Sequence, residues 1–495
     1  MSKQQDRADP TDRETPLDLG PDVFRAAGHE LVDQIAEFLA GLRDRPVAPG
    51  ESPERIRVAL DAGAPVPRDG VEPGPLLAGT ARLLFDHSLF NGHPRFFGYI
   101  TSSAAPIGML GDLLAAAVNP NVGGWDLSPM ASEIEAQAVR WVAELMDYPV
   151  DCGGLFLSGG NMANFTAAAA ARVAADPNVR SAGTDGRLRI YGSAETHTWV
   201  QKAADLLGLG TDAVRWVETD PQLRINVSAL RTALAEDRDA GAVPMMVIGT
   251  AGSVSTGAVD PLEEIAEVCA EHDVWFHVDG AYGGFAAVAP AAPEPLRHLA
   301  LADSVAVDPH KWLYSPLEAG CVLVRDRDAL RAAFAYHPPY YHFGQAAISY
   351  VDYGPQNSRG FRALKVWLSL RQVGRSGYER MIGDDIALSR RLHAAVEAHP
   401  ELEAVTQSLS INTFRYVPEE LRDGVGTPTG EERLNALNEA LLDRIQGSGE
   451  AFVSNAVLGG KFVLRACIVN FNTTAADVDA LPGVVARIGR ETFAG

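Results

Sequence analysis

Between about residues 153 and 307, short apolar runs alternate with helical patterns, and this alternation limits the possible folds more than any other feature. The runs at residues 155–157, 245–248, 274–278 and 304–307 have the length of buried strands. In the segments between them, apolar residues recur at helical spacing. Strands that alternate with helices form crossover units, so we predict a mainly parallel sheet with helices on both faces. Ligands of such sheets bind at the carboxyl ends of the strands.

The segments on either side of this region follow other patterns. Residues 21–42 carry apolar side chains at helical spacing, which predicts an amphipathic helix that needs a partner surface. Pro46 then ends the pattern, and the Pro/Gly-rich residues 49–75 predict an extended connection rather than a core element. After about residue 370 the pattern is helical again, with one further strand expected within residues 462–471. We therefore expect a tail and helical arm (1–104), a large domain (105–368) and a small C-terminal domain (369–495).

Charge and cysteine content narrow the range of partners and compartments. The formal charge of -22 opposes general binding to nucleic acid or to an anionic membrane, because both carry phosphate charges. The polar start lacks the apolar core of a signal peptide, and no apolar run approaches the roughly 18 residues of a membrane span. The four cysteines are scattered and predict neither a zinc ribbon nor a disulfide framework. We expect a cytoplasmic protein without a metal site that acts on small metabolites.

Two predicted strands are followed by residues whose side chains could take part in catalysis. Lys311 closely follows the run 304–307 in the sequence Asp-Pro-His-Lys-Trp, and Asp279 ends the run 274–278. A lysine beside a buried strand is costly unless it is paired, neutralised or covalently engaged. Taken singly, Lys311 is most simply a surface-turn lysine, and Asp279 a turn cap. Taken together, they match pyridoxal 5'-phosphate (PLP), which needs a lysine for its covalent link and an anion beside its ring nitrogen.

A glycine-rich turn precedes both residues, as a phosphate cradle should. Residues 153–161, Gly-Gly-Leu-Phe-Leu-Ser-Gly-Gly-Asn, lead from a strand into an alanine-rich helix. The glycines allow close approach of the backbone, and the helix start offers N–H groups and a positive dipole end to a phosphate. Such a turn is weak evidence alone, but it stands in the expected order along the chain.

With these motifs the chain resembles the group II PLP-dependent amino-acid decarboxylases, the family of aromatic-L-amino-acid decarboxylase, from about Phe24 to the C-terminus. The matching segments are residues 93–99, 153–161, 193–197, the strand that ends in Asp279, 308–312 and 461–465. The resemblance implies a type I, aspartate-aminotransferase-like PLP fold with a mainly parallel seven-stranded sheet, helices on both faces and a small C-terminal α+β domain. It also implies a homodimer with the active site at the subunit interface and the N-terminal helix packed on the second subunit.

The resemblance also implies a role for each matching residue. Lys311 would bind the cofactor covalently, Asp279 would form a salt bridge with the pyridine nitrogen, and His197 would stack on the ring. Without the resemblance, His197 would be read as a surface histidine in a polar turn. Further contacts with the cofactor would come from Thr250 and Ala281, which would line it, and from Ser158, Gly160, Asn161, Ser304 and His310 around its phosphate.

The reaction implied is loss of carbon dioxide from an L-amino acid, followed by protonation of the alpha carbon. A loop tyrosine is implicated as the proton donor in this family, and Tyr340 matches its position, with Tyr341 as an adjacent competitor. Relatives that form aldehydes by oxidative deamination characteristically lack that tyrosine or the ring-stacking histidine. This chain retains Tyr340 and His197, so we predict simple decarboxylation to the amine.

The substrate pocket departs from the aromatic-specific pattern. Many aromatic-specific enzymes carry Trp just before the His-Pro step, whereas this chain has Asn91-Gly92 there. Tyr99 and Trp125 still supply aromatic faces, which favours an aromatic amino acid. Asp126 stands where a small apolar residue is usual; it could pair with a cationic side chain, belong to a buried network or simply form a turn. A non-aromatic substrate, cationic or acidic, therefore remains an alternative.

Three other classes of function share some of these motifs. An aminotransferase would use the same fold and lysine but should carry an arginine for the carboxylate of its second substrate. A retro-aldol lyase would resemble the phosphorylated-sphingoid-base lyases, which share the lysine and the aspartate. A catalytically silent binding protein is the least favoured, because Lys311, Asp279 and His197 are all present.

Overall fold

The computed structural model describes residues 15–337 and 347–494. By its internal contacts the chain divides into two compact units, Met1–Phe90 with Gly447–Gly449, and Asn91–Gln446 with Glu450–Gly495. Within the described residues, no helix combines the length and the apolar character that crossing a membrane requires.

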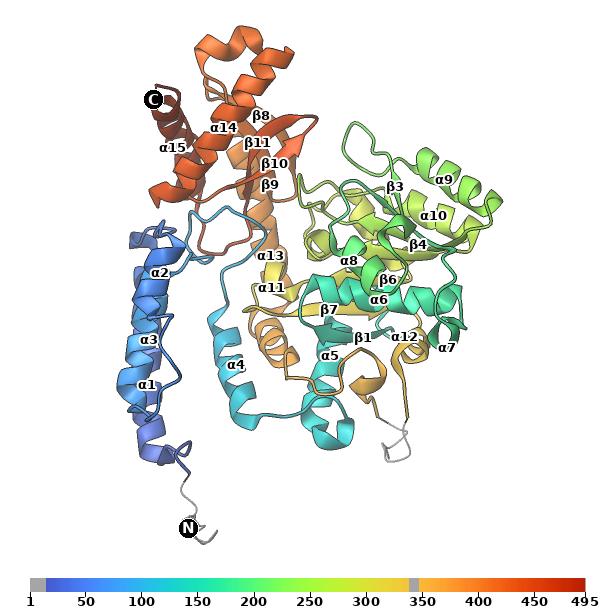
Figure 1. Ribbon diagram of the computed structural model, residues 1–495, viewed down its shortest axis with the longest axis horizontal. Coiled ribbons are helices and arrows are strands. Elements are labelled where there is room, and N and C mark those ends of the chain that lie inside the picture. Colours follow the sequence, from blue (N-terminus) through green and yellow to red (C-terminus); the bar gives the residue numbers. More distant parts are fainter. Residues whose placement is uncertain (1–14, 338–346, 495) are drawn as a thin grey trace, which may run out of the picture. The chain divides into compact units, whose positions relative to one another are not determined.

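The first unit is helical (Figure 1). Its helices are α1 (Gly20–Gly41), α2 (Pro53–Leu60) and α3 (Pro73–His87). The helix predicted for residues 21–42 is confirmed by α1, which packs against α3 through a stack of Phe38 on Phe85, with ring centroids 4.3 Å apart.

The extended connection predicted for residues 49–75 is wrong in part, because α2 lies inside this stretch and α3 begins at Pro73. The hydroxyl of Ser52 accepts the N–H of Arg55, and Pro53 occupies the first helical position. A proline is tolerated there because that N–H has no partner inside the helix.

A seven-stranded sheet forms the centre of the second unit, with the strand order β1-β7-β6-β5-β4-β2-β3. The strands are β1 (Gly153–Leu157), β2 (Leu188–Ser193), β3 (Val214–Val217), β4 (Val243–Thr250), β5 (Trp275–Asp279), β6 (Ser304–Val307) and β7 (Gly320–Val324). Only β7 runs against its neighbours in this sheet, and the remaining pairs, from β6 to β3, are parallel. The predicted fold class, a mainly parallel seven-stranded sheet of the type I PLP fold, is confirmed.

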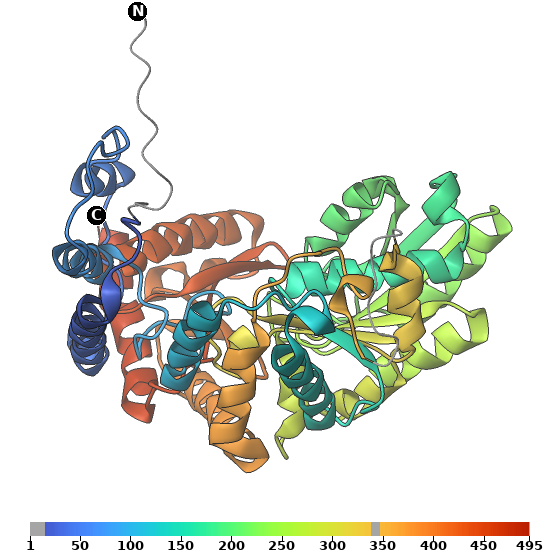
Figure 2. The ribbon, with the colours of Figure 1, turned by 90° about the horizontal axis from the view of Figure 1, so that it is seen from below.

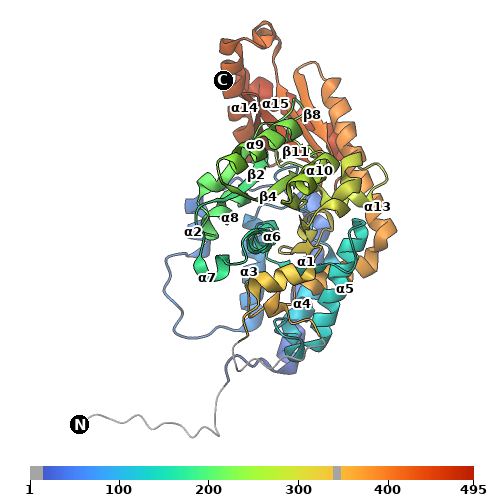
Figure 3. The same ribbon diagram turned by 90° about the vertical axis from the view of Figure 1, so that its right-hand side faces the viewer.

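Helices bury both faces of this sheet, which explains why its strands are continuous apolar runs. On one face Val305 and Val307 join the core with α5 (Pro129–Leu145) and α10 (Leu262–His272). On the other face Ala306 packs with α6 (Gly160–Ala175), which Figure 3 shows nearly end-on. The remaining helices of this region are α4 (Pro106–Val118), α7 (Val179–Ala182), α8 (Trp199–Leu206), α9 (Val227–Asp239), α11 (Pro309–Trp312) and α12 (Arg327–Phe334).

A four-stranded antiparallel sheet follows in the same unit, drawn in orange and red in Figure 2. Its strands, in the order β10-β11-β9-β8, are β8 (Leu402–Ser408), β9 (Ile411–Tyr416), β10 (Ser454–Leu458) and β11 (Lys461–Cys467). Helices α13 (Ala363–Glu397), α14 (Pro428–Ser448) and α15 (Ala475–Ala494) accompany it. The strand expected within residues 462–471 is present as β11. The boundaries of the three domains drawn from the sequence stay a prediction.

Candidate functional site

A cavity of about 370 Å³ lies at the carboxyl ends of β1, β4, β5 and β6. Register explains why residues far apart in sequence meet there, since Thr250 pairs with Asp279 and Asp279 pairs with Ala306 across three adjacent parallel strands. Most residues predicted for the cofactor line this cavity, namely Ser158, Gly160, Asn161, His197, Thr250, Asp279, Ala281, His310 and Lys311.

Lys311 lies in the short helix α11, just beyond the end of β6. Its Nζ lies 3.0 Å from Oδ2 of Asp308, and about a fifth of its side chain is exposed. Asp308 is almost fully buried, so this pairing compensates a charge that would otherwise be costly to hold away from water. Lys311 therefore presents to the cavity an amine that is paired with Asp308 and partly accessible.

The residues after Lys311 anchor its turn to α13. The indole N–H of Trp312 donates to Asp385 at 3.0 Å, and the hydroxyl of Tyr314 donates to the same carboxylate oxygen at 2.8 Å. Burial raises the pKa of Asp385 to about 7, against the lowering effect of these two donors. The Trp312 ring also stacks on Tyr282, which lines the cavity, at 4.8 Å. This packing fixes the backbone from which Lys311 projects.

Asp279 is buried at the end of β5, and each of its carboxylate oxygens accepts a hydrogen bond. Oδ2 accepts the indole N–H of Trp199 at 2.7 Å, and Oδ1 accepts the backbone N–H of Ala281 at 3.1 Å. Each oxygen can accept further bonds, so the carboxylate can still bind a donor in the cavity. Its orientation is fixed before any ligand arrives.

His197 borders the same cavity from the loop after β2. Its Nδ1 accepts the backbone N–H of Trp199 at 3.2 Å. Although the residue is exposed toward the opening, the surrounding protein excludes enough water to lower the pKa of the imidazole. A neutral ring at pH 7 follows, which suits packing against a planar ligand.

The glycine-rich turn brings the start of α6 to the cavity. Gly159 has a φ of +101°, a conformation that side chains rarely adopt. A Cβ on Gly160 would lie 2.8 Å from Oδ2 of Asp308, so only glycine allows these segments to approach so closely. His310 is fixed opposite by its Nδ1, which lies 2.8 Å from the carbonyl oxygen of Ala319, and burial lowers its pKa.

The structure does not bring Ser304 to this cavity, which corrects the expectation from the sequence. Ser304 is the first residue of β6, so it lies toward the amino end of the strand, and it is fully buried. Its hydroxyl accepts the indole N–H of Trp275 at 2.8 Å and lies 2.8 Å from Nδ1 of His277. These partners satisfy the hydroxyl inside the sheet, away from any phosphate.

Three further residues belong to the site without having been predicted from the sequence, namely Asn164, Asp308 and Trp199. Asn164 lines the cavity, and its Oδ1 lies 2.7 Å from Nε2 of His277. Since Ser304 is left to donate to Nδ1, His277 donates from Nε2 to this amide oxygen. Burial lowers the pKa of His277 to about 4, which keeps the ring neutral at pH 7. Asp308 could have been found from the sequence, because it lies in the lysine motif three residues before Lys311. No local pattern indicates Asn164 or Trp199.

The predicted substrate residues do not line the Lys311 cavity of their own chain. Tyr99 is exposed, and its ring lies 5.9 Å from that of Phe452. Trp125 donates its indole N–H to Glu133, and the neighbouring Asp126 is exposed. The other predicted catalytic residue, Tyr340, lies outside the described residues.

The polar groups of the cavity fit PLP. Two buried oxygens, Oγ1 of Thr250 and Oδ1 of Asp308, have no hydrogen-bond partner among the described residues, so they are available to a ligand. A paired amine on Lys311, an oriented carboxylate on Asp279 and a helix start at Gly160 complete the functional groups that this cofactor requires.

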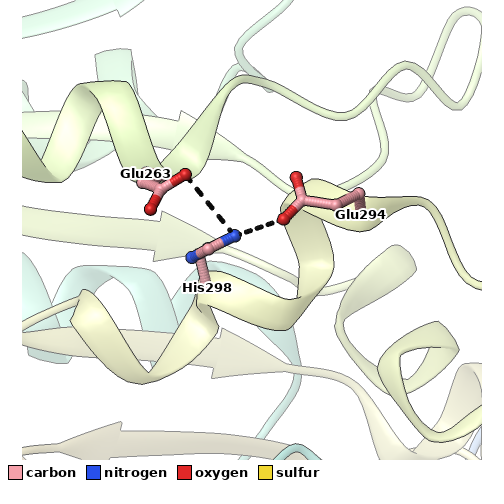
Figure 4. A group of neighbouring side chains, drawn as sticks. All are labelled: Glu263, Glu294 and His298. Atoms are coloured by element: carbon pink, nitrogen blue, oxygen red, sulfur yellow. Dashed lines mark hydrogen bonds and ion pairs between the residues drawn. The ribbon is translucent and has the colours of Figure 1, made fainter.

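A second cluster of polar residues lies outside this cavity, where Figure 4 shows His298 between two glutamates. Nε2 of His298 is 2.5 Å from Glu294 and 3.7 Å from Glu263. Both glutamates are exposed, and the arrangement is a surface ion pair of the i,i+4 type with one more distant acid.

Comparison with known proteins identifies one family over most of the chain. The family model described as the pyridoxal-dependent decarboxylase conserved domain matches residues 69–417. An aromatic-L-amino-acid decarboxylase of Bacillus atrophaeus is 34% identical over 468 residues, covering 93% of this chain and 94% of the relative. A 4-hydroxyphenylacetaldehyde synthase of Rhodiola rosea is 30% identical over 484 residues, covering 96% of each protein.

Among solved structures, the Oryza sativa TDC with PLP and tryptamine superimposes with a TM-score of 0.89 at 28% identity, covering 97% of this chain and 99% of that one. The fold, the site and these matches define a PLP-dependent carboxy-lyase that acts on amino acids. The chain belongs to the pyridoxal-dependent decarboxylase family, and its cofactor is PLP.

Proposed function

We propose that this carboxy-lyase converts an aromatic L-amino acid into the corresponding amine and carbon dioxide. The observation that carries the proposal is the convergence of Lys311 and Asp279 on one cavity from neighbouring strand ends. The aromatic substrate is supported by the Bacillus atrophaeus relative, which is named an aromatic-L-amino-acid decarboxylase. A cationic or acidic substrate remains the alternative, because Asp126 departs from the aromatic-specific pattern.

The residues of the cavity divide the work of binding and orientation. Lys311 would carry the cofactor and release it to the amine of the substrate, while Asp308 holds the lysine side chain in place. Asp279 would face the pyridine nitrogen, and His197 would pack on the ring. Thr250 and Ala281 would line the cofactor, with its phosphate at the start of α6 beside Ser158, Gly160, Asn161 and His310. PLP, when bound, supplies the electron sink for the breaking carbon–carbon bond.

The choice between amine and aldehyde depends on a proton at the alpha carbon. We infer that Tyr340 delivers this proton and that His197 keeps the ring in place, which favours the amine. An aldehyde-forming reaction is the second candidate, because the Rhodiola rosea relative is named a 4-hydroxyphenylacetaldehyde synthase.

We also infer a homodimer in which each subunit contributes to the other's active site. Tyr99, Trp125 and Asp126 lie outside the Lys311 cavity of their own chain, so a second copy would have to supply them. A surface suited to this contact is the apolar face of α4, whose leucines and valine are each more than half exposed. This face consists of Leu110, Leu113, Leu114 and Val118. Its contiguous apolar side chains are typical of a protein interface.

A cytoplasmic location stays a prediction. All four cysteines are free thiols, as a reducing compartment requires, and the net charge of -22 does not favour a nucleic-acid or membrane partner.

A screen for carbon dioxide release from all L-amino acids, with PLP added, tests the substrate class. We expect release from phenylalanine, tyrosine or tryptophan, and an amine product in equal amount. Release only from lysine, ornithine or glutamate would replace the aromatic substrate by the alternative. An aldehyde with peroxide would favour the second candidate, and turnover that depends on an added keto acid would identify an aminotransferase.

A further inference from the structure

Trp199 contacts both residues that we place against the cofactor ring. It begins α8, two residues after His197, and only 1% of it is exposed. Its indole N–H donates to Oδ2 of Asp279 at 2.7 Å, and its backbone N–H donates to Nδ1 of His197 at 3.2 Å. One residue therefore links the carboxylate below the cavity to the imidazole at its edge.

The surroundings of Trp199 leave the indole little freedom. The edge of the ring meets His277 at 5.7 Å and an interplanar angle of 85°, and His277 is itself bonded to Ser304 and Asn164. Val200 and Ala203 of α8 belong to the same buried cluster as Trp199. The N–H is thus aimed at the carboxylate by packing.

We propose that Trp199 is a positioning residue that holds the carboxylate of Asp279 correctly oriented for the cofactor's ring nitrogen. A hydrogen bond from a neutral donor stabilises a charged carboxylate in one orientation, and a carboxylate held facing the ring nitrogen stabilises the proton on that nitrogen. The hydrogen bond from the backbone N–H of Trp199 to His197 fixes the position of the imidazole relative to the same carboxylate. This inference rests on the role proposed above for Asp279.

Two variants test it. Trp199→Phe removes the donor and part of the volume, and benzothienylalanine at position 199 replaces only the N–H by sulfur and keeps the shape. Trp367→Phe is the matched control, because its indole also donates to a side chain, that of Gln137, and neither residue lines the cavity. Thermal unfolding of the apoprotein monitors any effect on folding.

Each protein is reconstituted with ¹⁵N-labelled PLP, and its PLP dissociation constant and the ¹⁵N signal of the ring nitrogen are measured. A lost hydrogen bond to a charged group typically changes an equilibrium by about tenfold to a hundredfold, so we expect PLP binding to weaken by that factor in both position-199 variants. The nitrogen signal should move toward the unprotonated position in both, and Trp367→Phe should change neither quantity.

Parent PLP affinity and a protonated nitrogen in the benzothienylalanine variant would overturn the inference. The same measurements on Asp279→Asn separate this result from a failure of the proposed site. If Asp279→Asn unprotonates the nitrogen and the position-199 variants do not, only the role of Trp199 is wrong. If the nitrogen stays protonated in Asp279→Asn, the carboxylate does not face it, and both proposals fall together.

Discussion

The carboxyl edge of the large sheet and the segment 91–130 contribute very differently to the active site. Within one chain the sheet edge assembles a lysine, an oriented carboxylate, a hydroxyl and a helix start around one cavity. The segment 91–130, which holds Tyr99, Trp125 and Asp126, contributes no residue to that cavity. The residues that we place at the cofactor thus meet within a single chain, whereas the residues that we place at the substrate lie outside this cavity.

This difference reflects how each region is positioned. Strand register fixes the residues of the sheet edge to one another, as the pairing of Thr250 with Asp279 shows. Tyr99 and Trp125 lie outside every strand of the sheet, so no ladder aligns them with Lys311. Changes at the sheet edge should therefore have large effects on chemistry, and changes in the segment 91–130 should act more weakly, through the substrate.

The largest effect is expected at Asp279. Replacing it with alanine removes the charge that we place at the ring nitrogen, and a preorganised electrostatic group is typically worth about 10²- to 10³-fold in rate. The steady-state decarboxylation rate should decrease by a factor near the upper end of that range, and PLP should bind more weakly. Asp273→Asn, at the exposed C-terminal cap of α10 just before this strand, is the control and should retain parent activity. Near-parent turnover in Asp279→Ala would remove the carboxylate from the mechanism.

Tyr340→Phe should reduce amine formation by about 10²-fold, because general acid catalysis contributes at least that factor. Carbon dioxide should still be released, and oxygen should then divert the product toward aldehyde, ammonia and peroxide. Product analysis and a peroxide assay measure this partition, with Tyr341→Phe as the matched control. Amine at the parent rate without new peroxide would assign the proton donor elsewhere, with Tyr341, His197 or Lys311 as candidates.

The sequence predicted the sheet edge well because strand ends and motif order are local properties. The runs ending at Asp279 and Val307 located two adjacent strands, and the topology placed their following residues together. Ser304 was misplaced although its strand was correct, because the motif did not show that the residue starts β6 at the edge away from the cavity. Trp199 and Asn164 could not be found, since their roles depend on contacts across 80 and 113 residues of sequence.

Variants at the proposed dimer interface test whether a second copy of the chain supplies the substrate residues. Glutamates in place of Leu113 and Leu114 would bury charge at the proposed interface, which we expect to weaken dimerisation by about tenfold to a hundredfold. Sedimentation should show monomers, and activity should become dependent on protein concentration. Val457→Glu changes another exposed apolar residue, on the small sheet, and should have neither effect. An active monomer of the parent protein at high dilution would contradict the shared site.

The smallest effect is expected at Asp126. If the substrate is aromatic, Asp126→Asn should change KM by less than about twofold, because an uncharged side chain forms no ion pair with the carboxylate and an exposed ion pair is worth at most about 1 kcal/mol in any case. If a cationic substrate is used, KM should rise by up to about fivefold for that substrate alone. Competition between an aromatic and a cationic amino acid in the parent and the variant distinguishes the two cases. Glu133, the partner of the Trp125 indole, provides a neighbouring control as Glu133→Gln.

The central claim is that Lys311 holds the cofactor at the carboxyl edge of the large sheet. Borohydride reduction of the PLP-loaded enzyme, followed by digestion and mass spectrometry, identifies the lysine that bears the reduced cofactor. We predict a single modified peptide that contains Lys311, and loss of the cofactor's visible absorbance in folded Lys311→Ala. The cofactor on another lysine of the parent enzyme, such as Lys202 in α8, or a trapped adduct in Lys311→Ala, would contradict the account.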